Sequence, residues 1–183
     1  MVYIFLAEGF EEIEALTPAD ILRRAGVEVA LAGVGGLEIT GAHGIRVSCD
    51  VTSADAAAAA ESAAGVQMII LPGGMPGADN LFASDDVRRA IEGAKASGAF
   101  IGAICAAPYI LGKLGLLRGR MATCYPGFED RLEGAEVYDC DVIRDGEIIT
   151  ARAMGAAVDF ALELTEALCG EDTAEKIRES ILA

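Results

Sequence analysis

The sequence predicts a single α/β domain in which helices cover both faces of a mostly parallel β-sheet. Short apolar runs of strand length alternate along the 183 residues with longer segments of helical periodicity. Apolar residues make up 53% of the composition, which is enough for one core in a chain of this length. No linker, repeat or compositional boundary interrupts the pattern, so we expect one domain over residues 1–183.

Five apolar runs have the length of buried parallel strands. They are Val2–Leu6, Val27–Leu31, Met68–Leu71, Phe100–Ile104 and Ile148–Thr150. Residues 122–150 look irregular apart from one expected hairpin, because Asp145-Gly146 is a strong turn signal between Val142–Arg144 and Glu147–Thr150.

The segments between these runs predict helices. Apolar residues share one stripe in Ala156–Cys169, as in a helix that packs on a sheet. Ser84 is a plausible N-cap for a helix that starts at Asp85, and the alanine-rich segment Ser53–Ala64 favours a helix through the high propensity of alanine. Pro18 is expected to restart or kink the helix over Glu11–Arg24, because proline has no N–H donor.

The charge balance argues against several classes of partner. A net charge of −15 repels nucleic acids and anionic membranes. No apolar run is long enough to span a bilayer, and no basic leader precedes the first strand, so we expect a cytoplasmic protein. The five cysteines are widely spaced and lack the paired spacing of a zinc site, which favours free thiols in a reducing compartment and no bound metal.

Three strand ends carry the candidate site, because ligands of open α/β sheets bind at the carboxyl ends of the strands. Cys105 lies between the strand Phe100–Ile104 and an apolar helical pattern, with small residues on both sides, as in a nucleophile elbow. The N-terminus of the following helix is expected to favour the thiolate. The plainer interpretation is a buried, inert cysteine.

The other two strand ends supply candidate partners for Cys105. Gly73 and Gly74 follow the strand Met68–Leu71 and offer flexible backbone for half of an oxyanion hole, or a plain Pro-Gly turn. Glu11 and Glu12 are expected to interact with the positive end of their helix. Glu14 either does the same or points toward the strand ends, where burial would keep its carboxyl group protonated so that it can donate to the sulfur of Cys105.

Several motifs together resemble the ThiJ/PfpI superfamily, in the branch of the parkinsonism-associated protein deglycase. The resemblance extends from about Val2 to Cys169 and implies a single ThiJ/PfpI domain with a flavodoxin-like three-layer sandwich, a homodimer and no cofactor. The motifs occur in the family's order, as Ala7-Glu8-Gly9-Phe10-Glu11-Glu12-Ile13-Glu14, Leu71-Pro72-Gly73-Gly74, Ala103-Ile104-Cys105-Ala106-Ala107-Pro108, and Thr150-Ala151-Arg152 with Asp159-Phe160-Ala161.

The resemblance also implies roles for individual residues. Cys105 would be held by a protonated Glu14, and the backbone amides of Gly74 and Ala106 would form the oxyanion hole. Arg24 matches an arginine near the family site, and Tyr125 stands where some members carry a histidine. His43, the chain's one histidine, either enters the partner subunit's site or is an exposed loop residue. Ala153-Met154 replaces the family's usual Gly-Pro.

These residues lead to a hypothesis of a glyoxalase or deglycase that acts on methylglyoxal-like dicarbonyls or their adducts without a cofactor. A second hypothesis is an oxidative-stress sensor or chaperone that works through oxidation of Cys105. An amidase or peptidase is less favoured, because the histidine that follows the cysteine in those branches is Ala106 here. A ligand-binding or structural module is the remaining alternative, since fold does not fix function.

Overall fold

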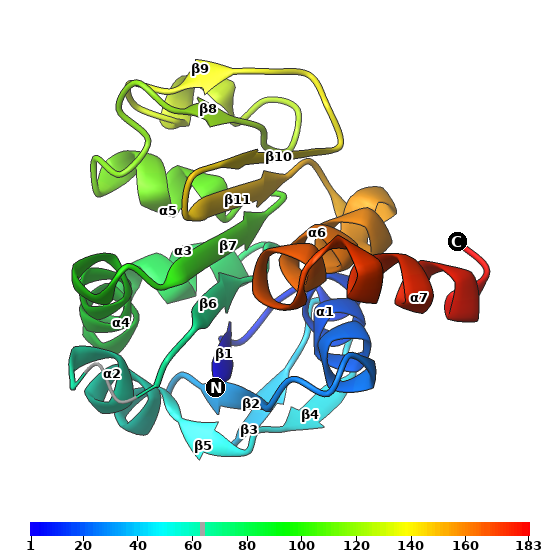
Figure 1. Ribbon diagram of the computed structural model, residues 1–183. Helices are drawn as coiled ribbons and strands as arrows, with labels where there is room; N and C mark the ends of the chain where they lie inside the picture. Colours follow the sequence, from blue (N-terminus) through cyan, green and yellow to red (C-terminus); the bar gives the residue numbers. More distant parts are fainter. Residues whose placement is uncertain (63–64) are drawn as a thin grey trace.

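The computed structural model describes residues 1–62 and 65–183. Within them, seven strands form a central sheet with the order β10-β11-β7-β6-β1-β2-β5 (Figure 1). Neighbouring strands are parallel except for the antiparallel pair β10 and β11, as predicted. The strands are β1 (Val2–Leu6), β2 (Val29–Gly33), β5 (Val51–Thr52), β6 (Met68–Leu71), β7 (Phe100–Ile104), β10 (Val142–Asp145) and β11 (Ile148–Ala151).

Helices cover both faces of this sheet, which gives the three layers that the sequence predicts (Figure 1). One face is covered by α1 (Glu12–Arg24), α6 (Ala157–Cys169) and α7 (Glu171–Ile181). The other carries α2 (Ser53–Glu61), α3 (Gly77–Ala83), α4 (Asp85–Ser97) and α5 (Pro108–Lys113). Smaller elements are the pair β3 (Glu38–Thr40) and β4 (Arg46–Ser48), the pair β8 (Met121–Ala122) and β9 (Glu136–Val137), and the 3-10 turns η1 (Glu129–Arg131) and η2 (Met154–Ala156).

The core consists of one apolar cluster on each face of the sheet. Phe5, Ile69 and Ile101 point into the cluster beneath α2–α5, whereas Ile4 and Ile70 point into the cluster beneath α1 and α6. Alternate residues of each central strand are therefore buried on opposite faces. This explains why these strands read as continuous apolar runs.

Several elements differ from the sequence predictions at their boundaries. The second strand begins at Val29 rather than Val27, because the Val27 amide donates to the Leu22 carbonyl at 3.0 Å and completes the end of α1. The helix predicted over Ser53–Ala64 ends at Glu61, with Ala63 and Ala64 outside the described residues. The hairpin around Asp145-Gly146 is confirmed.

Of the two outcomes expected at Pro18, a restart of the first helix does not occur. The helix α1 runs from Glu12 to Arg24 with Pro18 inside it. The helix loses one backbone hydrogen bond there, but Ala15, Ala19 and Leu22 are buried against the sheet and α6, and this packing holds the helix together. No helix among the described residues has both the length and the apolar character needed to cross a bilayer.

Gly93 permits a close approach between α4 and α2 that gives our first prediction. A Cβ atom at Gly93 would lie 2.7 Å from the carbonyl oxygen of Ala60 and 2.8 Å from the nitrogen of Glu61. These are backbone atoms, so the helices would have to separate. Overpacking against backbone atoms at this distance costs about 2–3 kcal/mol, the upper part of the usual range, whereas alanine recovers about 1 kcal/mol through helix propensity. We expect Gly93→Ala to lower the free energy of unfolding by about 1–2 kcal/mol in thermal or urea denaturation.

The matched control is Gly155→Ala, because a Cβ atom at Gly155 would meet nothing within 4 Å. This control should stay within about 0.5 kcal/mol of the unsubstituted protein. A Gly93→Ala protein that unfolds at the same or a higher denaturant concentration would contradict the close packing of α2 and α4.

Candidate active site

The three strand ends that the sequence singles out lie next to one another. Strands β1, β6 and β7 are adjacent and parallel, so their carboxyl ends reach the same edge of the sheet. Cys105 follows β7, Gly73 and Gly74 follow β6, and α1 with Glu14 begins soon after β1. The topology thus brings together three segments far apart in the sequence.

Cys105 occupies a sharp turn between β7 and α5, as the elbow pattern predicts. Its φ angle is 63°, a left-handed conformation that costs a residue with a side chain about 1–3 kcal/mol. Backbone hydrogen bonds hold it on both sides: its amide donates to the Ala151 carbonyl at 2.9 Å, and its carbonyl accepts from the Tyr125 amide at 2.8 Å. The neighbouring strand and loop therefore fix the half-buried thiol in place.

Glu14 points from α1 toward Cys105 and is only 1% exposed. Its Oε2 atom accepts a hydrogen bond from the Gly73 amide at 2.9 Å, and its carboxyl group also hydrogen-bonds the Cys105 side chain. A Cβ atom at Gly73 would lie 2.8 Å from both the Cβ of Cys105 and Oε2 of Glu14. Any side chain at position 73 would thus force the two apart, and the structure uses Gly73 for this close approach.

Burial opposes ionisation of both members of this pair. It raises the pKa of Glu14 to about 7, although hydrogen bonds from Cys105 and Gly73 act in the opposite direction. Burial also raises the pKa of the Cys105 thiol to about 12, and a charge on Glu14 adds to this effect. Two negative charges this close are unfavourable, so the pair carries one charge near neutral pH and shares one proton.

Two backbone amides favour a negative charge on the sulfur. The amides of Gly74 and Ala106 donate hydrogen bonds to the Cys105 sulfur, and these bonds lower the pKa of the thiol. They are the two groups that the resemblance implies for the oxyanion hole. The expected contribution of the following helix is smaller, because α5 begins only at Pro108 and has 6 residues. The sequence analysis expects the N-terminus of the following helix to favour the thiolate, but burial opposes the thiolate and is the larger effect on the Cys105 pKa.

Tyr125 lies beside Cys105 through its backbone. Its exposed side chain makes an edge-to-face contact with Phe128, with ring centroids 6.4 Å apart. A cleft of about 470 Å³ opens next to this loop, and its lining includes Cys124 and Arg152. This cleft lies beside the loop that contacts Cys105, but Cys105 and Glu14 do not line it.

Arg24 does not join this group within one chain. It is the last residue of α1, ten residues beyond Glu14, which corresponds to roughly 15 Å along the helix axis. Its Nε atom instead pairs with Asp20 at 2.7 Å. Within a single chain, the continuous helix α1 therefore places Arg24 away from the strand ends, and Arg24 lines the cleft on the outer face of α1 instead.

His43 is exposed and lies over the start of α1. Its Nδ1 atom is 2.9 Å from Oε2 of Glu12 and 3.7 Å from Oε1 of Glu11. Burial raises the pKa of Glu12, but its hydrogen bonds, above all that from His43, outweigh this effect and leave the pKa below its usual value. Glu12 thus anchors the His43 loop rather than acting only on its helix end. These three residues are the one group in the described part of the chain with metal-type ligand atoms within 4.8 Å of one another.

Sequence analysis missed the side chains that hold α5 behind the elbow. Tyr109 donates from its hydroxyl to Asp79 at 2.7 Å, and the Arg131 guanidinium lies 3.7 Å from the centre of its ring. Arg131 comes from η1, in the region that the sequence left irregular. The one available signal was a tyrosine inside an apolar run, since a buried phenol needs a hydrogen-bond partner.

Known proteins that are similar to this chain identify its family. The model of the DJ-1/PfpI family matches residues 1–167. Protein dj-1beta of Drosophila melanogaster is 35% identical over 182 residues, which cover 98% of this chain and 95% of that protein. The glutathione-independent glyoxalase DJR-1.2 of Caenorhabditis elegans is 34% identical over 167 residues, covering 90% of this chain and 86% of that protein.

Solved structures show the same fold. The crystal structure of Drosophila melanogaster DJ-1beta matches with a TM-score of 0.92 at 32% identity, and the match covers 100% of this chain and 97% of that one. Oxidized Toxoplasma gondii DJ-1 matches with a TM-score of 0.91 at 34% identity, over 99% of this chain and 97% of that one. The sequence and structural matches both span nearly the whole chain, and the chain therefore belongs to the DJ-1/PfpI family.

Proposed function

We propose that this protein is a cysteine-dependent glyoxalase or deglycase that converts methylglyoxal-like dicarbonyls, or their adducts, without a cofactor. The observation that carries the proposal is the contact between the Cys105 thiol and the buried Glu14 carboxyl group beneath two backbone amides. This arrangement combines a nucleophile, a proton carrier and an oxyanion hole. The glyoxalase name of the Caenorhabditis elegans relative supports the same reaction class.

The first step is addition of the Cys105 thiolate to the aldehyde carbon. A carbon–sulfur bond forms, the carbonyl π-bond breaks, and the resulting oxyanion lies within reach of the Gly74 and Ala106 amides until Glu14 gives it its proton and becomes a carboxylate. The product is a hemithioacetal. Burial alone raises the pKa of the Cys105 thiol further than that of Glu14 and so favours the proton on sulfur. The proposed mechanism instead has the proton on Glu14 at this stage, because the Gly74 and Ala106 amides stabilise a negative charge on sulfur.

Glu14 then moves a proton between the two adjacent carbons of the substrate. Its carboxylate removes the hydrogen from the carbon bonded to sulfur, and the carboxylic acid returns a proton to the neighbouring carbon. The hemithioacetal becomes a thioester of a 2-hydroxy acid through an enediol. Water hydrolyses this thioester, which frees Cys105 and gives lactate when the substrate is methylglyoxal. A pKa of about 7 suits Glu14 to both halves of this transfer.

A redox role is the second candidate. The half-buried Cys105 and the acidic hydrogen of Glu14 would equally suit oxidation to a sulfinate stabilised by a hydrogen bond, in a stress sensor or chaperone. The relative solved as oxidized Toxoplasma gondii DJ-1 favours this alternative. An amidase or peptidase remains less favoured, because Ala106 supplies no base beside the nucleophile.

Turnover under reducing conditions separates these roles. We expect the protein to consume methylglyoxal in the presence of a reductant, and Cys105→Ser to lower the rate at least about a thousandfold, as loss of a nucleophile does in other enzymes. Cys169→Ser is the control, because Cys169 is the last residue of α6 and does not line the cleft beside the Cys105 loop. Lactate formation measured by a coupled assay reports the reaction. Equal rates for the two variants would refute the proposed nucleophile.

The same assay predicts a pH dependence. Below the lower pKa of the pair both groups are protonated and no thiolate exists, so the rate should rise as the pH increases through about 7. A rate that falls over this range would mean that the fully protonated pair is the reactive form.

Substitution of Glu14 tests which atom holds the shared proton. If Glu14 donates to the thiolate, Glu14→Ala removes a charge-assisted hydrogen bond of roughly 1.5–3 kcal/mol and should raise the Cys105 pKa by about one to two units. Glu14→Gln keeps a donor and should shift it far less, while its turnover falls by about 100-fold through loss of proton transfer. Ultraviolet thiolate absorbance, corrected with Cys105→Ser, gives the pKa.

The direction in which Glu14→Ala shifts the Cys105 pKa shows which group holds the proton. If the proton instead resides on sulfur, Glu14→Ala removes a neighbouring negative charge and lowers the Cys105 pKa. A decrease, or no change, would contradict the proposed protonation state.

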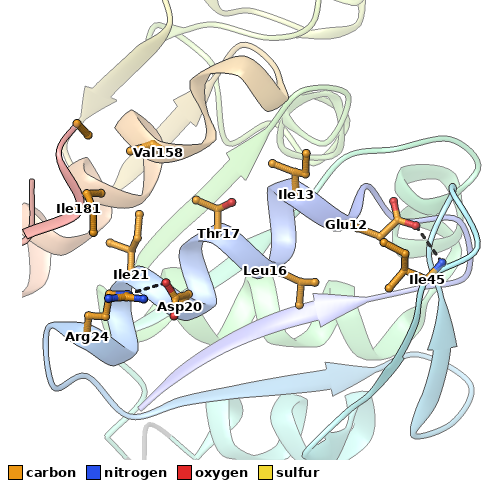
Figure 2. Close-up of a pocket in the computed structure, with 11 residues that line it drawn as sticks. Glu12, Ile13, Leu16, Thr17, Asp20, Ile21, Arg24, Ile45, Val158 and Ile181 are labelled. Carbon is orange, nitrogen blue, oxygen red and sulfur yellow. Dashed lines mark hydrogen bonds and ion pairs between the residues drawn. The ribbon is translucent and has the colours of Figure 1, made fainter.

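We also propose that the protein forms a homodimer through the outer face of α1. A cleft of about 570 Å³ lies on this face, and its lining includes Ile13, Ile21, Ile45 and Val158 (Figure 2). Ile13 is 47% exposed and Ile45 is 54% exposed, so apolar side chains from α1 and the β3–β4 loop are exposed to solvent on the same face. A second copy related by a twofold axis would bury the same residues on both subunits, which is how a homodimer conceals such a face.

Light scattering at micromolar concentration should therefore give about twice the chain mass of 18.9 kDa. Ile13→Glu should shift the mass to that of the monomer, since it places a charge in the proposed interface. Val137→Glu introduces the same charge at a partly exposed apolar residue outside this face and should leave the mass unchanged. A monomeric unsubstituted protein, or equal effects of both substitutions, would exclude this interface.

A further inference from the structure

A second cavity lies at the edge of the sheet opposite the catalytic cysteine. It has a volume of about 330 Å³ and opens where β7 and β11 begin, between the end of α4 and the segment that follows α5. Ile101 and Ile148, which are 2% and 5% exposed, form its floor together with Ala99 and Leu116. The cavity is thus a preformed space with an aliphatic floor, at the lower end of the volumes of small-molecule sites.

The rim of this cavity carries a cation with no carboxylate partner. Lys95 in the last turn of α4 lines it, and among residues 1–62 and 65–183 no acidic group forms an ion pair with Lys95. Lys113, by contrast, pairs with Glu133. Within the described part of the chain, Lys95 therefore leaves an ammonium group without a carboxylate partner at the rim of a cavity with an aliphatic floor.

The other charged groups at the cavity limit the charge of a ligand. The Nη1 atom of Arg120 donates to the Asp145 carbonyl at 2.8 Å, and its guanidinium lies 3.5 Å from Oδ1 of Asp145 and 3.6 Å from Oε2 of Glu147. Two carboxylates therefore balance Arg120 and would repel a doubly charged anion such as a phosphate. Lys95 remains to accept a single negative charge.

We propose that this cavity binds a small monocarboxylate, with its aliphatic body on Ile101, Leu116 and Ile148 and its carboxylate paired with Lys95. The aliphatic floor excludes highly hydroxylated ligands, because their hydroxyl groups would lose hydrogen bonds to water without finding partners. Lys95 is the cation at the cavity without a carboxylate partner among the described residues, so it favours a ligand with one negative charge. Neither argument involves Cys105, so the proposal is independent of the reaction proposed above.

Hexanoate is a suitable probe, with 1-hexanol as its uncharged counterpart and inorganic phosphate as an anion without an aliphatic body. In a titration of the ¹⁵N-labelled protein followed by NMR, hexanoate should give saturable shifts at the amides of Ala99, Leu116 and Ile148. 1-Hexanol and phosphate should bind at least about tenfold more weakly, since a hydrogen bond between charged groups is lost in one case and the apolar contact in the other.

Substitutions at the lysines then test the role of the charge. Lys95→Met keeps the aliphatic stem and should weaken hexanoate binding about tenfold or more, and Lys95→Glu should abolish it. Lys176→Met is the matched control, because Lys176 is also exposed but lies on α7 and does not line the cavity. It should bind hexanoate like the unsubstituted protein.

Four results would overturn the proposal. They are the absence of saturable shifts, shifts centred on residues around Cys105 instead of the cavity, unchanged affinity of Lys95→Met and Lys95→Glu, and phosphate binding as tight as that of hexanoate. Because Lys95 is exposed, its substitution should not prevent folding, and the amide spectrum of each variant checks this directly.

Discussion

The candidate site depends on the contact between two buried acids that cannot both be ionised. Glu14 and Cys105 come from segments 91 residues apart, and the absence of a side chain at Gly73 lets them touch. Burial makes each group resist ionisation, and proximity makes a second charge unfavourable once the first is present. One proton is therefore shared by the two groups. In the proposed reaction, the sulfur can attack only when that proton is on Glu14, and Glu14 can accept a proton from the substrate only after it has given that proton away.

The rest of the molecule holds this pair in position. The parallel order of β1, β6 and β7 brings the segments together, and the cores on both faces of the sheet fix the strands. Behind the elbow, Arg131 lies over the ring of Tyr109 and links η1 to α5. On the other side of Cys105 lies strand β11, and the carbonyl group of its last residue accepts a hydrogen bond from the Cys105 amide. Side-chain packing behind the elbow and backbone hydrogen bonds from β11 thus both hold Cys105 in place.

Local patterns in the sequence predict the architecture and the central residues well. Apolar runs locate the central strands, Asp145-Gly146 locates the hairpin, and small residues around Cys105 indicate the elbow. These features depend on neighbours along the chain. The structure was needed for what depends on distant groups, namely the effect of burial on the Cys105 thiol and the bond between Glu12 and His43. Residue spacing also did not show that a continuous α1 places Arg24 far from the strand ends within one chain.

The left-handed backbone at Cys105 has a consequence for how this position changes over generations. Glycine and asparagine adopt such a conformation more readily than cysteine does, so a chain selected for stability alone would tend to replace Cys105. Substitutions that relieve strain at active sites commonly stabilise a protein while they remove its activity. The cysteine and the fold are therefore under opposing selection. Cysteine would be kept at this turn, where glycine or asparagine is less strained, only if the thiol itself gives the protein a benefit.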